Sequence, residues 1–478
     1  MAVADAPVPK LQARAADCAE RLLEADSVLL ASHIDADGLT SAAVAATALE
    51  RAGLPFEVVF EKQLDADALA ALAGREYETV LFTDFGSGQL DIIADHEAAG
   101  DFTPVIADHH QPAEATTDYH LNPLLEGIDG ASELSGAGAA YLLARALASA
   151  SNADGRLDNR DLAALAVVGA VGDMQASGGQ LQGANEDIVA EGVDAGVLTE
   201  TKDLAVYGKQ TRPLPKLLEY ASDVRLPGIT NDERGAISFL DDLAVDCRTD
   251  GDWKRWVDLT DSEKQTVASG LVQYAVNRGV PAYKIERLVG TSYVLNEEEP
   301  GTELRDASEF STLLNATARY ERADVGLAVC LGDRKEALDR ARELLSNHRR
   351  NLSEGIEWVE EHGVTKTDHL QWFDAGDEIR ETIVGIIAGM SMGADGVSRD
   401  RPIIAFAEKG DEETKVSARG TGPLVGRGLD LSVVMGEAAR AVGGDGGGHD
   451  VAAGATIPAG NEAEFVDHAD EIVADQLG

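Results

Sequence analysis

The chain has few cysteines, no long apolar run and a shortage of basic residues, and each shortage excludes a class of protein. Three cysteines, Cys18, Cys247 and Cys330, are far apart and lack metal-cluster spacing, so we expect free thiols in a reducing compartment and no disulfide framework. No segment offers the roughly 20 consecutive apolar residues that cross a bilayer, and residues 1–10 lack the basic and apolar regions of a secretory signal. We therefore expect a cytoplasmic protein with no membrane partner.

The shortage of basic residues bears on the kind of partner the protein takes. The chain has 40 Lys and Arg against 85 Asp and Glu, a formal net charge of −45. Alone, this disfavours nucleic acid, because phosphate binding depends on cationic contacts. The acids are spread over the whole chain at a normal hydrophobic content of 44%, which is typical of a halophilic protein and not of a disordered acidic tail. Because 1 M salt shortens the Debye length to about 3 Å, local cations decide whether a polyanion binds.

The first 200 residues alternate short apolar runs with helix-like segments, a pattern that predicts a mostly parallel α/β sheet. At 478 residues, the chain has room for two to four domains in all. Strands are expected over 27–32, 56–60, 79–83 and 104–107, and helices over 38–53, capped by Thr40 or Ser41, over 136–150 and over 162–171.

The pattern weakens from about 200 to 305 and then recovers. A helix is expected to begin near Thr260, and Trp253 and Trp256 before it are expected to pack inside this region and not to stack on bases. A long amphipathic helix over 333–361 suits a connector, and the last hundred residues return to α/β character. There we expect a helix over 379–390, strands over 402–407, 415–419 and 451–457, and a glycine-dense turn over 443–449, after an earlier helix over 307–320.

Acids and histidines gather at the ends of the apolar runs of the N-terminal half. The segments are His33-Ile-Asp35-Ala-Asp37-Gly38, Thr83-Asp84, Asp108-His109-His110 and Gly172-Asp173. An open α/β sheet places its ligand crevice at such ends. If the chain stays extended after the first strand, alternate residues 33, 35 and 37 point to one side.

This set of side chains predicts a metal site. Carboxylates and imidazoles without thiolates suit Mn²⁺ or Mg²⁺, and two such ions can activate water and stabilise a leaving oxygen at phosphorus. Each group has a plainer interpretation: a lone Asp after a strand is usually a helix cap, and a His pair is often a surface feature. Four acid-bearing ends in order favour the two-metal phosphoesterase instead.

The same four segments resemble the ordered motifs of the DHH phosphoesterase superfamily. In the C-terminal part, Gly446-Gly447-Gly448-His449-Asp450 followed by Ala452-Ala453-Gly454 resembles the companion DHHA1 domain. The segments 314–319, 383–388 and 417–419 are similar to segments of RecJ-type exonucleases, and the resemblance points most closely to the archaeal RecJ-like nucleases.

The resemblance implies a two-lobed α/β fold with its active site in the cleft between the lobes. It would comprise a parallel-sheet DHH catalytic domain over 1–200, an insertion of open role over 201–305, a helical connector over 306–365 and an α/β DHHA1 substrate-binding domain over 366–478. Bacterial RecJ has an acid at the position of His33, a difference that bears on metal choice, and its additional C-terminal OB-type domain is not expected here.

The resemblance also implies roles for individual residues. His33, Asp35 and Asp84 would bind one Mn²⁺ or Mg²⁺, with Asp84 bridging to a second ion. Asp108 would orient His109, and His110 would face the scissile phosphate as the catalytic imidazole. The second ion would be held by Asp37, Asp84, His109 and Asp173, and the substrate phosphate by Arg419 and His449 with the backbone of Gly447 and Gly448.

The expected activity is therefore metal-dependent hydrolysis of single-stranded DNA, with RNA left open, from one end to mononucleotides, in replication or repair. Two alternatives stay open from the sequence. A DHH enzyme could act on short oligonucleotides or cyclic dinucleotides with the same metal motifs. The chain could also be a scaffold that binds a replisome or repair protein and has a weak or silent site.

Overall fold

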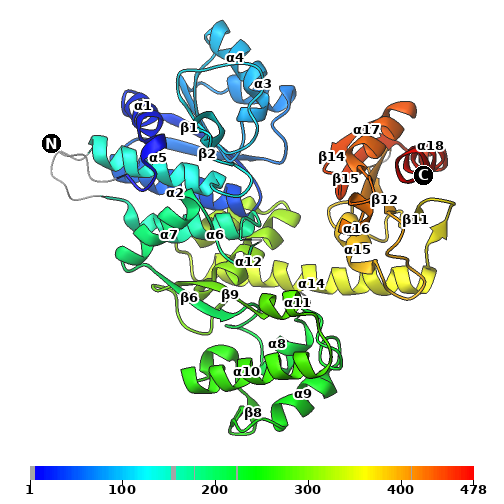
Figure 1. Cartoon of the computed structure of the whole chain (residues 1–478). Coiled ribbons are helices and arrows are strands. Elements are labelled where there is room, and N and C mark those ends of the chain that lie inside the picture. Colours follow the sequence, from blue (N-terminus) through cyan, green and yellow to red (C-terminus); the bar gives the residue numbers. More distant parts are fainter. Residues whose placement is uncertain (1–5, 152–157, 177, 222–223, 411) are drawn as a thin grey trace. The chain divides into compact units, whose positions relative to one another are not determined.

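The computed structural model describes residues 6–151, 158–176, 178–221, 224–410 and 412–478. The chain forms two compact units, Met1–Arg342 and Glu343–Gly478 (Figure 1). No helix among the described residues is both long and apolar enough to cross a membrane.

The first unit contains a five-stranded, fully parallel sheet in the order β2-β1-β3-β4-β5. Strand β1 is apolar over nearly its whole length because helices cover both faces of the sheet. Leu29 and Ala31 of β1 and Phe82 of β3 share a core with α3 and α4 on one face. The elements are β1 (Val28–His33), β2 (Phe56–Glu61), β3 (Thr79–Thr83), β4 (Thr103–Ala107), β5 (His120–Leu121), α1 (Gln12–Leu23), α2 (Ala36–Ala52), α3 (Ala66–Ala73), α4 (Leu90–Ala99), α5 (Gly136–Ser151), α6 (Ala163–Gly172) and α7 (Ala184–Asp194).

Helix α2 begins earlier than the sequence predicted. Asp35 is its N-cap and accepts a hydrogen bond from the Gly38 amide at 3.0 Å, so Thr40 and Ser41 lie inside the helix and are buried. The chain is therefore not extended through residue 37, and the condition under which residues 33, 35 and 37 would point to one side does not hold. A Cβ on Gly38 would lie 2.1 Å from the His33 carbonyl oxygen, so the tight turn from strand to helix requires a glycine here.

The described residues between Leu204 and Leu288 form a small helical subdomain with its own core, next to a two-stranded antiparallel ribbon. The helix predicted to begin near Thr260 is α10, and Thr260 caps it in a reciprocal capping box with Glu263. Trp256 is buried in the core of the subdomain, and Trp253 packs under the Arg248 guanidinium, which confirms their packing role. The elements are β6 (Leu198–Leu204), β9 (Val289–Leu295), α8 (Leu214–Glu219), α9 (Glu233–Asp241), β7 (Arg248–Thr249), β8 (Asp252–Trp253), α10 (Asp261–Asn277) and α11 (Ala282–Ile285).

Helix α12 (Ala307–Arg319) joins this subdomain to the parallel-sheet domain. Glu309 near its start is buried and accepts hydrogen bonds from the Gln210 amide at 2.7 Å and the Thr211 hydroxyl at 2.5 Å. Further along, the Asn315 side chain accepts one from the Ala36 amide at 3.0 Å. One helix therefore contacts both the helical subdomain and the loop between β1 and α2. It is followed by α13 (Ala323–Cys330) and α14 (Glu336–His362).

The buried Glu309 predicts a stability that depends on pH. Burial raises the pKa of its carboxyl from 4.5 to about 7. Between these values the unfolded state has released the proton and the folded state has kept it, so stability falls as pH rises through this window. We expect Glu309→Gln to be more stable than the wild type by up to about 3 kcal/mol above pH 7 and no different near pH 4.5. Urea unfolding followed by tryptophan fluorescence at pH 4.5 and 8 measures this, and an advantage that is equal at both would contradict it.

The second unit is built on a mixed six-stranded sheet in the order β10-β11-β12-β13-β15-β14. The glycine run predicted as a turn is the edge strand β14, and a Cβ on Gly446 would lie 2.7 Å from the Met435 carbonyl oxygen of α17. The helix predicted over 379–390 begins only at Val384; Ile379 and Ile383 lie before it, outside any helix, and are buried in the same core as its residues. The elements are β10 (Thr365–Lys366), β11 (Gln371–Asp374), β12 (Ile403–Lys409), β13 (Glu413–Arg419), β14 (Asp445–Gly448), β15 (Ala452–Pro458), α15 (Val384–Ser391), α16 (Gly422–Val425), α17 (Leu431–Ala441) and α18 (Glu462–Leu477).

Candidate metal centre

The acids and histidines singled out in the N-terminal half meet at the carboxyl edge of the parallel sheet. His33 ends β1, Asp84 follows β3, the residues from Asp108 follow β4, and Asp173 ends α6. Their ligand atoms form overlapping groups, each with all atoms within 4.8 Å of one another. The groups are His33, Asp35 and Asp84; Asp37, His109 and Asp173; and Asp84, Asp108, His109 and His110.

The first group contains two carboxylates that face the same nitrogen of one imidazole. Nδ1 of His33 lies 3.2 Å from Oδ2 of Asp35 and 3.6 Å from Oδ2 of Asp84. Burial alone would lower the pKa of His33, but hydrogen bonds to these carboxylates and their charges raise it to about 10. Burial alone would raise the pKa of Asp35, but the same contact with His33 lowers it to about 2. In the absence of a metal, the imidazolium therefore neutralises part of the negative charge.

Asp37 lies in the first turn of α2 and faces the N-terminus of α5. Its two carboxylate oxygens accept hydrogen bonds from the Gly136 amide at 2.7 Å and the Ala137 amide at 2.9 Å. A helix N-terminus stabilises an anion. Even so, burial, together with the charges of Asp84 and Asp173, raises the pKa of Asp37 well above its usual range. The two amide donors therefore do not fully offset the burial of the Asp37 carboxylate and the negative charges of Asp84 and Asp173.

Asp84 is at the centre of the site and is strained. It is 2% exposed, and its φ is +60°, a left-handed conformation that costs a non-glycine residue about 1–3 kcal/mol. Its Oδ1 is buried with no hydrogen bond, 3.3 Å from Nε2 of His109. An unpaired buried carboxylate oxygen is costly, and a cation would give it a partner. The residues present therefore fit divalent ions, with Asp84 shared between two of the groups.

The geometry of His109 leaves one nitrogen free for a ligand role. Its Nδ1 lies 2.7 Å from the Gly130 carbonyl oxygen, to which an N–H there donates. Nε2 then faces Asp84 at 3.3 Å and Asp37 at 3.8 Å. A backbone carbonyl that holds one imidazole nitrogen is a common device for orienting the other toward a metal.

Asp108 orients His110, and not the ring of His109 as expected from the sequence. Its Oδ1 accepts from Nδ1 of His110 at 2.8 Å and from the His109 amide at 2.7 Å, and its Oδ2 accepts from the Ser87 amide at 2.9 Å. Both oxygens are thus occupied, and we do not count Asp108 as a ligand. Burial would raise the pKa of Asp108, but the hydrogen bond and charge of His110 hold it below its usual range. The hydrogen bond to Asp108 raises the pKa of His110.

A cavity of about 580 Å³ lies beside these residues. Apart from the acids and histidines, its wall includes Lys62 and Gln63 after β2, and Phe85 and Gln89 after β3. Lys62, which ion-pairs with Glu321, was not among the residues predicted for the site. Its signal was available, because a lysine directly after a parallel strand lies at the same sheet edge as the acids.

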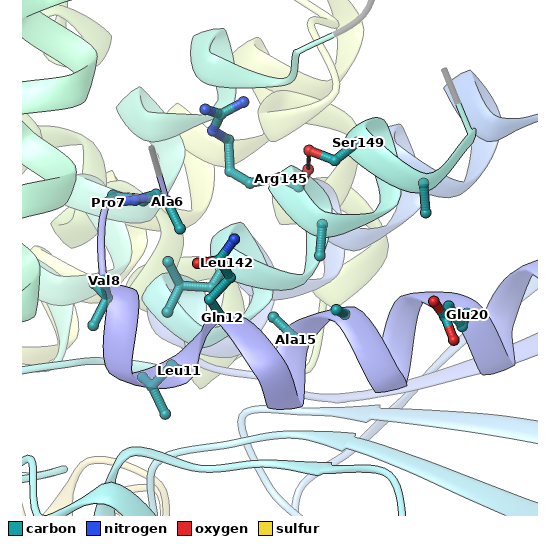
Figure 2. Close-up of a pocket in the computed structure, with 13 residues that line it drawn as sticks. Ala6, Pro7, Val8, Leu11, Gln12, Ala15, Glu20, Leu142, Arg145 and Ser149 are labelled. Atoms are coloured by element: carbon teal, nitrogen blue, oxygen red, sulfur yellow. Dashed lines mark hydrogen bonds between the residues drawn. The ribbon is translucent and has the colours of Figure 1, made fainter. Parts of the chain in front are cut away.

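A second cavity, of about 260 Å³, lies between α1 and α5 and is a poorer candidate (Figure 2). Leu11, Ala15 and Leu142 give it a mostly aliphatic wall. Its Arg145 donates to both oxygens of Glu191, at 2.6 and 3.1 Å. It therefore lacks the converging titratable groups of the cavity at the sheet edge.

The residues predicted to bind substrate phosphate gather at one end of the C-terminal sheet. Arg419 at the end of β13 and Gly448 of β14 pair with adjacent residues of β15, Ala452 and Ala453, and the His449 amide donates to the Ala452 carbonyl at 2.9 Å. Gly447 precedes Gly448 in β14 and pairs with Gly454 of β15. A Cβ on Gly385 of α15 would lie 2.7 Å from Nη2 of Arg419, so the helix leaves room for the guanidinium. The second unit therefore brings these predicted residues together.

Because α5 lies close to Asp84, we expect a single methyl group added at Gly136 to disturb the candidate metal centre. A Cβ on Gly136 would lie 2.3 Å from Oδ1 of Asp84, whereas one on Gly88, which lines the same cavity, meets only the Gln111 carbonyl oxygen at 3.9 Å. We expect Gly136→Ala to weaken Mn²⁺ binding by roughly 10–100-fold, as other changes around metal ligands do, and Gly88→Ala to leave it unchanged. Calorimetric Mn²⁺ titration of both variants measures this. Equal affinities would show that Asp84 can shift freely.

Comparison with known proteins identifies the family. The chain matches the DHH family, N-terminal domain, over residues 27–170, the DHH-CID domain over 206–289 and the DHHA1 domain over 370–475. It is 31% identical over 455 residues to an uncharacterized protein of Methanocaldococcus jannaschii, covering 93% of each chain.

Solved structures show the same fold at low sequence identity. RecJ from Thermus thermophilus in complex with Mn²⁺ is 18% identical with a TM-score of 0.61, over 98% of this chain and 55% of that one, so our chain spans about half its length. An exonuclease RecJ bound to manganese is 17% identical with a TM-score of 0.60, over 99% and 96%. CDC45 from Entamoeba histolytica is 12% identical with a TM-score of 0.64, over 98% and 97%. The chain belongs to the DHH/DHHA1 phosphoesterase superfamily, with a RecJ-like fold and a candidate divalent-metal centre at the edge of its parallel sheet.

Proposed function

We propose that this protein is a two-metal exonuclease that hydrolyses single-stranded nucleic acid from an end and releases mononucleotides. The observation that carries the proposal is the convergence of two ligand groups, one of His33, Asp35 and Asp84 and one of Asp37, His109 and Asp173, with Oδ1 of Asp84 3.3 Å from Nε2 of His109. His33, Asp35 and Asp84 would hold one Mn²⁺ or Mg²⁺, and Asp37, Asp84, His109 and Asp173 the other. Bound there, two such ions supply an activated water and neutralise charge on the phosphoryl group.

The protein's own groups hold and orient the substrate. His110 lines the cavity with its Nδ1 bonded to Asp108, so the Asp108 carboxylate stabilises its charged form. An imidazolium there can contact a phosphate oxygen or protonate the leaving oxygen. In the second unit, Arg419 and His449 would bind further phosphates, since a guanidinium donates charge-assisted hydrogen bonds to them and an imidazole N–H donates another.

The cavity favours unpaired nucleotides. Its volume of about 580 Å³ is in the range of small-molecule sites, and its wall combines the aromatic Phe85 with the amides of Gln63 and Gln89. A terminal nucleotide with an unpaired base could enter such a space. A base held inside a duplex could not, and we therefore propose a preference for single strands.

The overall charge of −45 does not exclude this substrate. Two divalent ions would add four positive charges at the acid cluster, and Lys62 lines the same cavity. At high salt, the distant acids are screened over a Debye length of about 3 Å at 1 M. The contacts inside the cavity then decide binding.

End-labelled substrates test the proposal. Purified protein is incubated with Mn²⁺ in high salt with single strands that carry the label at the 5′ or the 3′ end, made as DNA and as RNA, beside a duplex. We expect release of mononucleotides from one end of the single strands and little from the duplex. No hydrolysis by protein that holds bound Mn²⁺ would overturn the proposal. Turnover confined to dinucleotides or cyclic dinucleotides would replace it with the short-substrate alternative.

A further inference from the structure

The turn that follows α6 has a methionine at the position where such turns usually have a glycine. Asp173 ends the helix, the Met174 amide donates to the Val171 carbonyl at 3.1 Å, and the Gln175 amide donates to the Ala170 carbonyl at 3.0 Å. This is the bonding of a Schellman motif, in which the left-handed residue is usually glycine. Here it is Met174, with a φ of +60° and a 79% exposed side chain. The turn directs two successive side chains to opposite sides, Met174 outward and Gln175 into the protein.

Gln175 links three segments of the metal centre through one amide group. It is 3% exposed, and its Nε2 donates to Oδ2 of Asp173 at 2.9 Å and to the Gly130 carbonyl oxygen at 2.9 Å. That carbonyl is the one that accepts from Nδ1 of His109 at 2.7 Å. A single NH₂ group therefore contacts one candidate ligand directly and reaches a second through a shared carbonyl.

A second amide fixes the orientation of the first. Nδ2 of Asn185, at the start of α7, donates to Oε1 of Gln175 at 2.6 Å. Asn185 is itself buried, and its backbone amide donates to the Glu133 carbonyl at 2.8 Å. Because Oε1 is occupied by a donor, Gln175 must present its NH₂ to Asp173 and Gly130. The network admits one assignment of the amide.

Asp173 needs such a donor because of its place in the fold. A helix C-terminus carries partial negative charge and disfavours a carboxylate. Asp35 and Asp37 lie at the start of α2, where helix N–H groups are available, but Asp173 lies at the opposite end of its helix. The Gln175 N–H partly offsets the missing helix donors while the other oxygen of Asp173 stays free of hydrogen bonds to described residues.

We propose that Gln175 is a positioning residue of the second ion site, the one formed by Asp37, Asp84, His109 and Asp173, and that Asn185 sets its amide. This inference rests on the proposed two-metal function. Gln175 does not touch the substrate. It holds Asp173, which lies 3.8 Å from Nδ1 of His109, in place, and it steadies the carbonyl that turns Nε2 of His109 toward Asp37 and Asp84.

Manganese binding provides a test with a readout other than activity. Gln175→Met keeps an unbranched side chain of similar length but removes both donated hydrogen bonds. We expect the second Mn²⁺ to bind roughly 10–100-fold more weakly while the first keeps its wild-type affinity. Two Mn²⁺ about 3.5–4 Å apart are magnetically coupled, so at saturation the wild type should show a coupled electron paramagnetic resonance spectrum. At one equivalent, the variant should show a single-ion spectrum.

Two controls make the result specific. Met174→Asn changes the exposed neighbour to a residue that tolerates a positive φ, and Gln210→Met makes the same substitution at a buried glutamine in the helical subdomain. Both should bind two coupled ions. If Gln175→Met fails to fold by circular dichroism, Asn185→Leu, which frees the Gln175 amide to rotate, should show the same loss of the second ion.

The outcomes separate this inference from the function it rests on. A variant that binds a coupled pair with wild-type affinity overturns the role of Gln175 and leaves the nuclease proposal standing. A wild type that never binds a coupled pair overturns both. Equal weakening of both ions in Gln175→Met would show a structural role of the residue and would also overturn the inference.

Discussion

Asp84→Asn is expected to abolish hydrolysis while leaving the fold intact. The substitution keeps the size of the side chain, and asparagine tolerates the φ of +60° observed here, whereas alanine would add backbone strain and a cavity. It removes the carboxylate that would bridge the two proposed ion sites, which lies 3.6 Å from Nδ1 of His33 and 3.3 Å from Nε2 of His109. Because charge stabilisation at the reacting phosphate depends on both ions, we expect kcat/KM to fall by roughly a thousandfold or more.

Thermal unfolding with and without Mn²⁺ separates lost metal from lost fold. A ligand that binds only the folded state stabilises it by about 2.7 kcal/mol at a hundredfold excess over Kd, so the wild type should gain stability on addition of Mn²⁺. Asp84→Asn should lose most of that gain and still unfold cooperatively without metal. Asp91→Asn, on the exposed side of α4, removes the same charge away from the cluster and should behave as the wild type. Full activity of Asp84→Asn would exclude a bridging role for this residue.

The sequence located the metal centre because the sheet is parallel. In such a sheet the carboxyl ends of neighbouring strands lie at one edge, so residues after the apolar runs must converge whatever the loops between them do. His33 ends β1, and Asp84 and Asp108 follow the adjacent strands β3 and β4. Their convergence follows from strand order alone, which is why a pattern of apolar runs was sufficient.

The sequence did not predict the hydrogen-bond partner of each side chain. Asp35 would share one side with residues 33 and 37 on an extended segment, but it is a helix cap, because a carboxylate one residue before a helix gains a backbone N–H. Asp108 was expected to hold His109, but Gly130, 21 residues further along the chain, provides the carbonyl that does so. Any residue can supply a carbonyl, so no sequence pattern marks it.

The glycine run shows the same limit in the second unit. A run of three glycines is typical of a flexible turn, yet Gly446 and its neighbours form the edge strand β14 against β15. The reason is the close approach of α17, which leaves no space for a Cβ at Gly446. Packing between elements distant in sequence therefore decides what a glycine does, and only the structure shows that packing.

His110→Ala is expected to reduce turnover without removing metal. The ring is bonded through Nδ1 to Asp108, and it lines the cavity beside the ligand groups. Loss of a positioned general acid or base costs typically 10²–10⁴-fold in rate, and we expect a fall in kcat of that size. Because the other candidate ligands remain, the variant should still bind two Mn²⁺. His96→Ala on α4, whose ring pairs with Asp101, controls for the loss of a partly exposed imidazole.

A double-mutant cycle tests whether Asp108 acts through His110. Asp108→Asn replaces one carboxylate oxygen by an NH₂ group. If the remaining oxygen accepts from Nδ1 of His110, the NH₂ faces the Ser87 N–H, and in the other orientation it faces the imidazole N–H. We therefore expect roughly a 10–100-fold loss of activity. If Asp108 works only by orienting that ring, the double variant should be no slower than His110→Ala alone, since residues that act as one unit are strongly non-additive. Multiplicative losses would instead give Asp108 a separate role, and loss of one Mn²⁺ from His110→Ala would make this imidazole a ligand.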